Sequence, residues 1–290
     1  MRWISATIGV VLCIAASDIV RAQEAPAASA VSAPSTPAEA DINATTQSAP
    51  DFLNKFSLSA GASAWTGDYG AKSNSDIQAA LFGARYSLGD LRLTASIPYM
   101  RIDSAGALFT GLEGAPLIVA PGALPHKTIR KGFGDLTLGA SYFLPSEKFL
   151  GVDVELISRV KLPTASTSSG LSTGKTDYSF GTEISKTFDK FSPFASVSYR
   201  RFGDTNQWRL KDGFATSIGS SYKITNTFIV LASYDYAQRT SAFIRDDHEI
   251  VTSASYRFPR SPIRLSGYTS YGLSTGAAAF SGGLSLSVSL

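Results

Sequence analysis

Hydrophobic and polar side chains alternate along most of the chain after about residue 56. The alternation is clearest in three runs, 135–144, 152–162 and 177–185, where aliphatic and aromatic residues occupy every second position. A period of two predicts extended strands with one apolar and one polar face. The charged residues stand in mid-strand on the face opposite the aliphatic ones, so we expect the polar face to contact water.

The same pattern predicts twelve strands, at about 56–66, 77–87, 91–99, 135–144, 152–162, 177–185, 195–200, 214–222, 228–236, 250–258, 263–271 and 280–290. Short connections alternate with longer ones at 67–76, 104–131, 164–174, 202–212, 240–247 and 273–279. A soluble β-sandwich predicts no such alternation, whereas bacterial outer-membrane barrels combine an even strand number with short periplasmic turns and longer outer loops. The pattern therefore favours an all-β, 12-stranded antiparallel transmembrane up-and-down β-barrel, with both ends of the chain in the periplasm.

Aromatic residues that share the apolar phase gather at the two ends of the predicted strands. The group at the short-turn end consists of Tyr86, Tyr142, Tyr222, Phe228, Tyr256 and Phe258. The group at the long-loop end consists of Tyr99, Tyr178, Tyr199, Phe214, Tyr236, Tyr271 and Phe280. Mainly Leu, Val, Ile and Ala lie between them. Two aromatic girdles around an aliphatic band are typical of a wall that faces lipid.

The N-terminal segment differs in composition from the predicted barrel at 52–290. Residues 1–22 have a positive start at Arg2, an apolar stretch over 4–16 and small residues before Gln23, which predicts a secretory signal peptide. The single cysteine, Cys13, lies inside this stretch, so we expect no disulfide in the mature protein. Residues 23–51 are rich in Ala, Pro and Ser and predict a disordered linker. No later stretch is long and apolar enough for a transmembrane helix.

Several short blocks resemble the "MetA-pathway of phenol degradation" family. These are 132–139 (GFGDLTLG), 160–164 (VKLPT) and 173–178 (TGKTDY), followed by 233–236 (SYDY) and 271–274 (YGLS). The resemblance covers most of 56–290. It implies an outer-membrane barrel that takes up small, often aromatic or hydrophobic, compounds, and it brings no catalytic or ligand-binding residues. Barrels of this kind usually end in an aromatic residue, whereas Leu290 ends this sequence, a departure that bears on recognition by the barrel assembly machinery.

The polar phase predicts the residues that line the interior. The positive ones are Arg85, Arg92, Arg159, Lys161, Arg200, Lys223, Arg239, Arg257 and Arg264, and the negative ones are Asp135, Asp153, Glu155, Asp177, Glu183, Asp235 and Glu249. One interpretation is a pore wall whose opposed charges set selectivity. The other is a network of ion pairs that fills a narrow barrel, and the two can coexist, since twelve strands lie between filled and open barrels.

The 104–131 loop is unusually apolar for an exposed segment. Candidate gate residues within it are Leu108, Phe109, Leu112, Leu117, Ile118 and Val119. Such a surface is not expected to stay in water. Either the loop folds into or over the mouth as a constriction, or it packs on the rim or on a neighbouring subunit.

No catalytic site, cofactor or metal site is predicted. The strings 170–174 and 272–276 fit a nucleophile elbow, but that elbow needs a strand-to-helix turn and both strings lie between strands. The two histidines, His126 and His248, are isolated in sequence. Net charge is only +3, so no nucleic-acid partner is expected.

We therefore expect an outer-membrane channel for passive passage of small, aromatic or hydrophobic compounds. The expected partners are outer-membrane lipids, the barrel assembly machinery and a small-molecule solute. The alternatives are an outer-membrane barrel enzyme of the phospholipase type, for which His248 would be essential, and a closed structural or adhesive barrel.

Overall fold

The computed structural model describes residues 55–144, 151–203, 205 and 207–290. The expected signal peptide and linker lie outside these residues. The wall consists of β1 (Lys55–Gly67), β2 (Ser75–Leu88), β3 (Leu91–Ser104), β6 (Thr128–Phe133) with β7 (Leu136–Leu144), β8 (Asp153–Leu162), β9 (Asp177–Ser185), β10 (Phe191–Arg201), β11 (Gly213–Thr225), β12 (Phe228–Ala237), β13 (Asp247–Arg257), β14 (Ile263–Gly272) and β15 (Phe280–Ser289).

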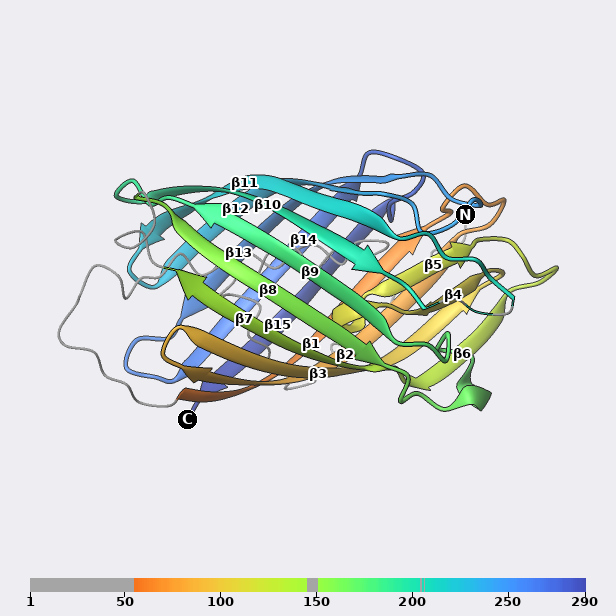
Figure 1. Ribbon diagram of the computed structural model, residues 1–290, viewed down its shortest axis with the longest axis horizontal. Helices are drawn as coiled ribbons and strands as arrows, with labels where there is room; N and C mark the ends of the chain where they lie inside the picture. The colour runs from red at the N-terminus through yellow and green to blue at the C-terminus, as the bar shows by residue number, and fades with distance from the viewer. Residues whose placement is uncertain (1–54, 145–150, 204, 206) are drawn as a thin grey trace, which may run out of the picture.

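These strands form one closed antiparallel barrel (Figure 1). Each wall strand pairs with its neighbours along the chain, and β1 pairs with β15 as well as with β2, which closes the ring. Both β6 and β7 pair with β3, so they are two parts of one wall strand. The wall therefore has the predicted twelve strands. Since the Leu290 amide donates to the Phe56 carbonyl at 2.8 Å, the first and last strands meet at the short-turn end.

The interruption between β6 and β7 marks the place where another segment contacts the wall. The Gly134 amide donates to the Pro98 carbonyl at 2.8 Å, so the pairing with β3 continues across the gap. A Cβ atom at position 134 would lie only 2.4 Å from the Thr110 Oγ1, which explains the glycine. The fourth strand thus begins at Thr128 rather than near 135. The sequence prediction missed β6 because its inward and outward faces both carry charged residues, Arg130 and Lys131.

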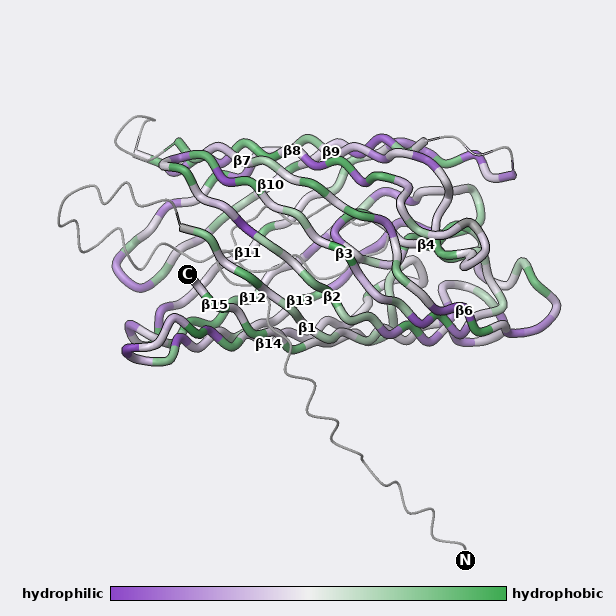
Figure 2. The backbone as a smooth tube through the Cα atoms, turned by 90° about the horizontal axis from the view of Figure 1, so that it is seen from below, coloured by the Kyte–Doolittle hydropathy of each residue, from purple (hydrophilic) through white to green (hydrophobic). Residues whose placement is uncertain are grey.

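The alternation along the strands sorts side chains to the two sides of the wall as predicted. Ile218 is 63% exposed, whereas its neighbour Ser217 is 3% exposed and faces the interior. Figure 2 shows the resulting alternation of hydrophobic and hydrophilic positions along the tube. Of the predicted girdle aromatics, Tyr86, Phe228 and Tyr236 are half-buried and the others are exposed on the outer face. An apolar outer surface with aromatic residues at both ends is that of a barrel surrounded by lipid.

The apolar loop carries a small hairpin inside the barrel. It consists of β4 (Ala107–Thr110) and β5 (Pro116–Ala120), joined through a 3-10 turn, η1 (Leu112–Gly114). Figure 2 shows β4 between the walls, at the end opposite the C-terminus. A second 3-10 turn, η2 (Thr167–Ser169), lies in the β8–β9 loop. Among the residues that the structure describes, no helix could cross a membrane.

Candidate functional site: the interior of the barrel

The short-turn half of the interior carries charged residues on the inner face of the wall. Arg92 and Glu155 form an ion pair at 3.0 Å and are both buried. The remaining residues of this half are buried or half-buried on the inner face: Arg85, Asp153, Glu183, Lys223, Arg257 and Arg264. Arg257 and Arg264 are cross-strand neighbours, as are Glu155 and Glu183, so charges of one sign are grouped rather than evenly mixed.

Three predicted lumen residues meet in a fully buried ion-pair cluster on the long-loop side of this half. The Lys161 Nζ lies 2.6 Å from the Asp177 Oδ2 and 3.3 Å from the Asp135 Oδ2. All three side chains have no exposed surface. Asp135 sits at the gap between β6 and β7, where it also accepts hydrogen bonds from the Ala165 amide at 3.0 Å and the Ser172 hydroxyl at 2.7 Å. The cluster therefore joins three wall segments and fixes the start of the β8–β9 loop.

The same lysine and two arginines hold the hairpin against this side of the wall. Lys161 donates to the Thr110 carbonyl at 3.1 Å, and Arg159 forms an ion pair with Glu113 of η1. Arg130 of β6 donates to the carbonyls of Leu108 at 2.8 Å and Gly106 at 3.0 Å. Cations from the wall thus satisfy carbonyls of a segment that lies inside a low-dielectric interior, where unpaired carbonyls are costly.

The hairpin is also bound to the opposite side of the mouth. In the β12–β13 loop, Thr240 donates to the Ile118 carbonyl at 2.8 Å, and Ser241 donates to the Val119 carbonyl. These residues are 122 positions apart in the chain. The hairpin therefore spans the interior between β6–β8 and the β12–β13 loop.

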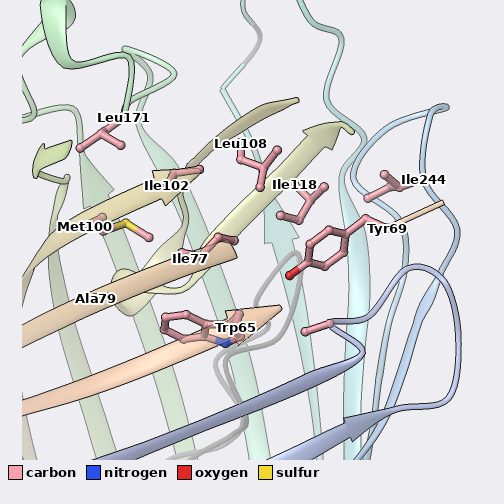
Figure 3. Packing of buried hydrophobic residues seen from close by; sticks show 11 residues of the cluster. Trp65, Tyr69, Ile77, Ala79, Met100, Ile102, Leu108, Ile118, Leu171 and Ile244 are labelled. Carbon is pink, nitrogen blue, oxygen red and sulfur yellow. The ribbon is translucent and has the colours of Figure 1, made fainter. Parts of the chain in front are cut away.

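Apolar side chains from the wall and the loops close around the hairpin at the long-loop end (Figure 3). One cluster, here called the mouth cluster, contains Trp65, Tyr69, Ile77, Ala79, Met100, Ile102, Leu108, Ile118, Leu171, Ile244 and Ala278. A second contains Leu117, Val119, Phe202 and Leu210, with Ala107, Phe109 and Trp208 packed against it. Five of the six gate candidates are fully buried or nearly so, and Phe109 is half-buried.

The mouth cluster corrects the expectation that the inner face is wet throughout. Trp65, Ile77, Met100 and Ile102 occupy the polar phase of the first three strands, yet they are apolar and point inward. A signal was present in the sequence, since inward-phase apolar residues concentrate at the long-loop ends of these strands. The charged members of that phase alone do not reveal it, because they lie mainly in other parts of the strands.

Two buried polar atoms of the mouth cluster have no hydrogen-bond partner among the described residues. They are the Trp65 Nε1 and the Tyr69 hydroxyl oxygen, and Figure 3 shows the Tyr69 hydroxyl directed toward Trp65. Burial, together with the nearby charges of Asp247 and Glu249, raises the pKa of Tyr69. The tyrosine therefore keeps its proton and remains a donor at any pH that the cell meets.

The other predicted lumen residues lie nearer the long-loop end of the wall, or outside the wall in the case of Arg239. Arg200 is fully buried and donates to the Gln238 carbonyl at 2.9 Å, and Asp235 accepts a hydrogen bond from Ser217. Glu249 is fully buried on β13. Arg239 is exposed in the β12–β13 loop, because β12 ends at Ala237 and the strand phase does not extend to it.

The structure places one pair of residues from the catalytic alternatives in contact, because the His248 amide donates to the Ser274 hydroxyl oxygen at 3.2 Å, which is a backbone contact and not one of the imidazole. The His248 Nδ1 lies 2.6 Å from the Tyr234 hydroxyl, and His126 is exposed in its loop. The serines of the two elbow-like strings, Ser172 and Ser274, donate to Asp135 and to the Asp246 carbonyl in loops between strands. The described part of the chain contains no group of three or more residues that could hold a metal ion.

Comparison with solved structures finds proteins of low sequence identity. A Pseudomonas aeruginosa FadL homologue is 10% identical, with 81% of this chain and 90% of that chain covered and a TM-score of 0.41. The Pseudomonas putida toluene transporter TodX is 13% identical, with 83% and 89% covered and a TM-score of 0.38. The β domain of the Bordetella autotransporter BrkA is 13% identical, with 81% and 99% covered and a TM-score of 0.48. These values indicate a distant likeness of shape.

Sequence comparison gives a more specific result. No individual curated protein is similar enough in sequence to count as a match. The family model described as "MetA-pathway of phenol degradation" matches residues 58–290, which is most of the chain and all of the wall after the first residues of β1. The chain therefore belongs to the MetA-pathway of phenol degradation family.

Proposed function

We propose that this protein is an outer-membrane channel that lets small apolar compounds, aromatic ones among them, pass without an energy source. The observation that carries the proposal is that the side chains inside the closed wall change from apolar to charged along the barrel. An apolar mouth cluster lies at the long-loop end, and charged side chains line the interior below it. The family to which the chain belongs is named for phenol degradation, which fits a solute with an aromatic ring.

The proposed orientation places the long loops and the mouth cluster outside the cell. An apolar solute would enter among side chains such as Trp65 and Met100, which favour it by the hydrophobic effect. The Trp65 N–H and the Tyr69 hydroxyl could donate to a hydroxyl or carboxylate oxygen of the solute. The charged half below would then release it toward the periplasm, because the apolar contacts end there.

In this proposal the β4–β5 hairpin is the gate, with Leu108, Phe109, Leu112, Leu117, Ile118 and Val119 as its apolar surface. It is held by hydrogen bonds, one ion pair and apolar packing, and gating requires these contacts to break while the strands of the wall stay paired. Its contacts to both sides of the interior equally support the alternative of a barrel closed to solute. Conductance distinguishes the two.

Single-channel recordings of the refolded barrel, with and without phenol or benzoate, test the channel. We expect measurable conductance that the aromatic solute lowers while it occupies the mouth. Replacement of 108–124 by a short Gly-Ser linker should raise the conductance, since it removes the hairpin strands from the interior. Unchanged conductance after this deletion would contradict gating. If neither the wild type nor the deletion variant conducts, that result would favour the closed barrel.

A milder pair of variants tests the attachment of the hairpin without changing the hairpin itself. Thr240→Val with Ser241→Ala removes the two donors to the Ile118 and Val119 carbonyls. We expect more frequent opening than in the wild type. Ser261→Ala is the matched control, because it removes a local hydroxyl contact to the Ile263 amide in a short turn at the other end of the barrel.

A further inference from the structure

The outer face of the wall carries a groove across five neighbouring strands, three of which present small residues to the membrane. Its floor is formed by Ala62 and Ala64 of β1, Ala80 of β2 and Gly282 of β15. Leu284 and Phe280 form one side, and Tyr99 and Arg101 of β3 form the other. The volume of the groove is about 800 Å³. Most of the outer wall carries large side chains instead, so this is a local depression in the lipid-facing surface.

The strand register aligns the groove with two basic residues. Ala64 pairs with Gln78, Gln78 with Arg101, and Arg101 with Lys131, which forms one row across the outer face from β1 to β6. The next row toward the short turns runs from Ala62 through Ala80 and Tyr99 to Phe133. The Tyr99 and Phe133 rings meet edge to face at 5.3 Å. The basic pair therefore lies one row beyond the aromatic girdle, at the level where head groups begin.

Arg101 and Lys131 are like charges placed directly opposite each other, an arrangement that destabilises a strand pair on its own. Neither forms an ion pair or a hydrogen bond with another of the described residues. The carboxylates of Asp76 and Asp103 stand one row further out, and Asp76 is already bound by Lys127 at 3.5 Å and by the Thr66 hydroxyl at 2.9 Å. An anion from outside the chain would relieve the repulsion between the two cations.

We propose that this groove binds the phosphorylated glycolipid of the outer leaflet, lipid A. Arg101 and Lys131 bind a phosphate, for which the planar guanidinium offers paired donors and the ammonium a point charge. An acyl chain fills the groove over Ala62, Ala64 and Ala80, where it gains dispersion contacts with the wall. The orientation, with the long loops outside, is that of the proposed function, whereas solute passage is not required for this site.

The wall also provides a matched control. Arg201 ends β10, is exposed on the outer face and pairs with Tyr178 of the neighbouring strand. It thus lies at a comparable level, next to an aromatic residue, but its cross-strand partner is not basic. If any outward arginine bound the glycolipid equally well, Arg201 would contribute as much as Arg101.

The test is titration of the full barrel, delipidated in mild detergent, with lipid A, followed by native mass spectrometry. We expect Arg101→Gln with Lys131→Gln to weaken binding by roughly tenfold or more, the scale of lost charge-assisted hydrogen bonds. Arg201→Gln should leave affinity within about twofold of the wild type, as expected for an exposed side chain outside the groove. Dephosphorylated lipid A should bind the wild type as weakly as lipid A binds the double variant. Ala64→Leu, which fills the groove, should also weaken lipid A binding.

Equal affinity of the wild type and the double variant for lipid A would overturn the proposal. Equal affinity of the wild type for lipid A and for phosphatidylglycerol would overturn it too, because the site would then recognise any lipid phosphate. If the double variant does not fold, Lys131→Gln alone replaces it, since that side chain is exposed. Conductance is measured on the same variants and should not change. If the wild type binds lipid A but shows no conductance, that result would therefore count only against the proposed function.

Discussion

Substitution of Lys161 by Met tests how the interior of the barrel is held together. The ammonium lies between two buried carboxylates, at 2.6 Å from Asp177 and 3.3 Å from Asp135, and also donates to the Thr110 carbonyl. Methionine keeps most of the volume of lysine but removes the charge. Two carboxylates would then remain in a site with no exposed surface and without their common cation.

The expected loss follows from that geometry. Removing one partner of a buried ion pair costs about 3–5 kcal/mol, because the remaining charge keeps its desolvation cost without compensation. Here two carboxylates and one hairpin carbonyl lose their donor, so we expect the upper part of that range. The triple variant Lys161→Met, Asp135→Asn, Asp177→Asn removes all three charges and should regain most of the loss, since a neutral replacement of a buried network is often tolerated.

The assay is equilibrium urea unfolding of the refolded barrel, followed by tryptophan fluorescence, because Trp65 and Trp208 both lie at the mouth. Lys72→Met is the control and should change the free energy of unfolding by less than about 0.5 kcal/mol, since that lysine is exposed in the β1–β2 loop. A loss below about 1 kcal/mol for Lys161→Met would refute the reasoning. So would a triple variant as unstable as the single one. Conductance should rise in the single variant, because the hairpin loses one of its bonds to the wall.

Three further substitutions test other parts of the structure. Ile118→Ala should destabilise the barrel by about 2–5 kcal/mol, as expected for a buried aliphatic side chain, and a loss below about 1 kcal/mol would mean that the hairpin is not packed in the interior. Ile218→Arg should cost about 2–4 kcal/mol in lipid bilayers with Ile218→Leu as control, and an unaltered free energy of unfolding would argue that this face does not contact lipid. Trp65→Phe keeps a ring in the mouth cluster but removes an N–H without a described partner, so stability should change by less than about 1 kcal/mol while the block of conductance by phenol weakens. Equal block by phenol in the variant would exclude Trp65 from solute binding.

The alternation of side chains determined the wall from the sequence alone. A period of two assigns each residue of a strand to one face, so the twelve strands, the outward aromatic residues and the buried charges such as Arg92 and Glu155 followed without knowledge of the fold. The family resemblance led to the same architecture. The partner of each charge did not follow, because cross-strand register depends on pairing across the whole ring.

The contents of the mouth were decided by tertiary structure. The apolar loop was evident from its composition, but its location between Arg130 on one side and Thr240 on the other depends on tertiary contacts, one of which joins residues 122 positions apart. The pairing of Arg101 with Lys131 likewise needed the register of β3 and β6, and the side-chain pattern does not predict β6. Local patterns determine which way a side chain points, whereas closure of the barrel determines which side chains it meets.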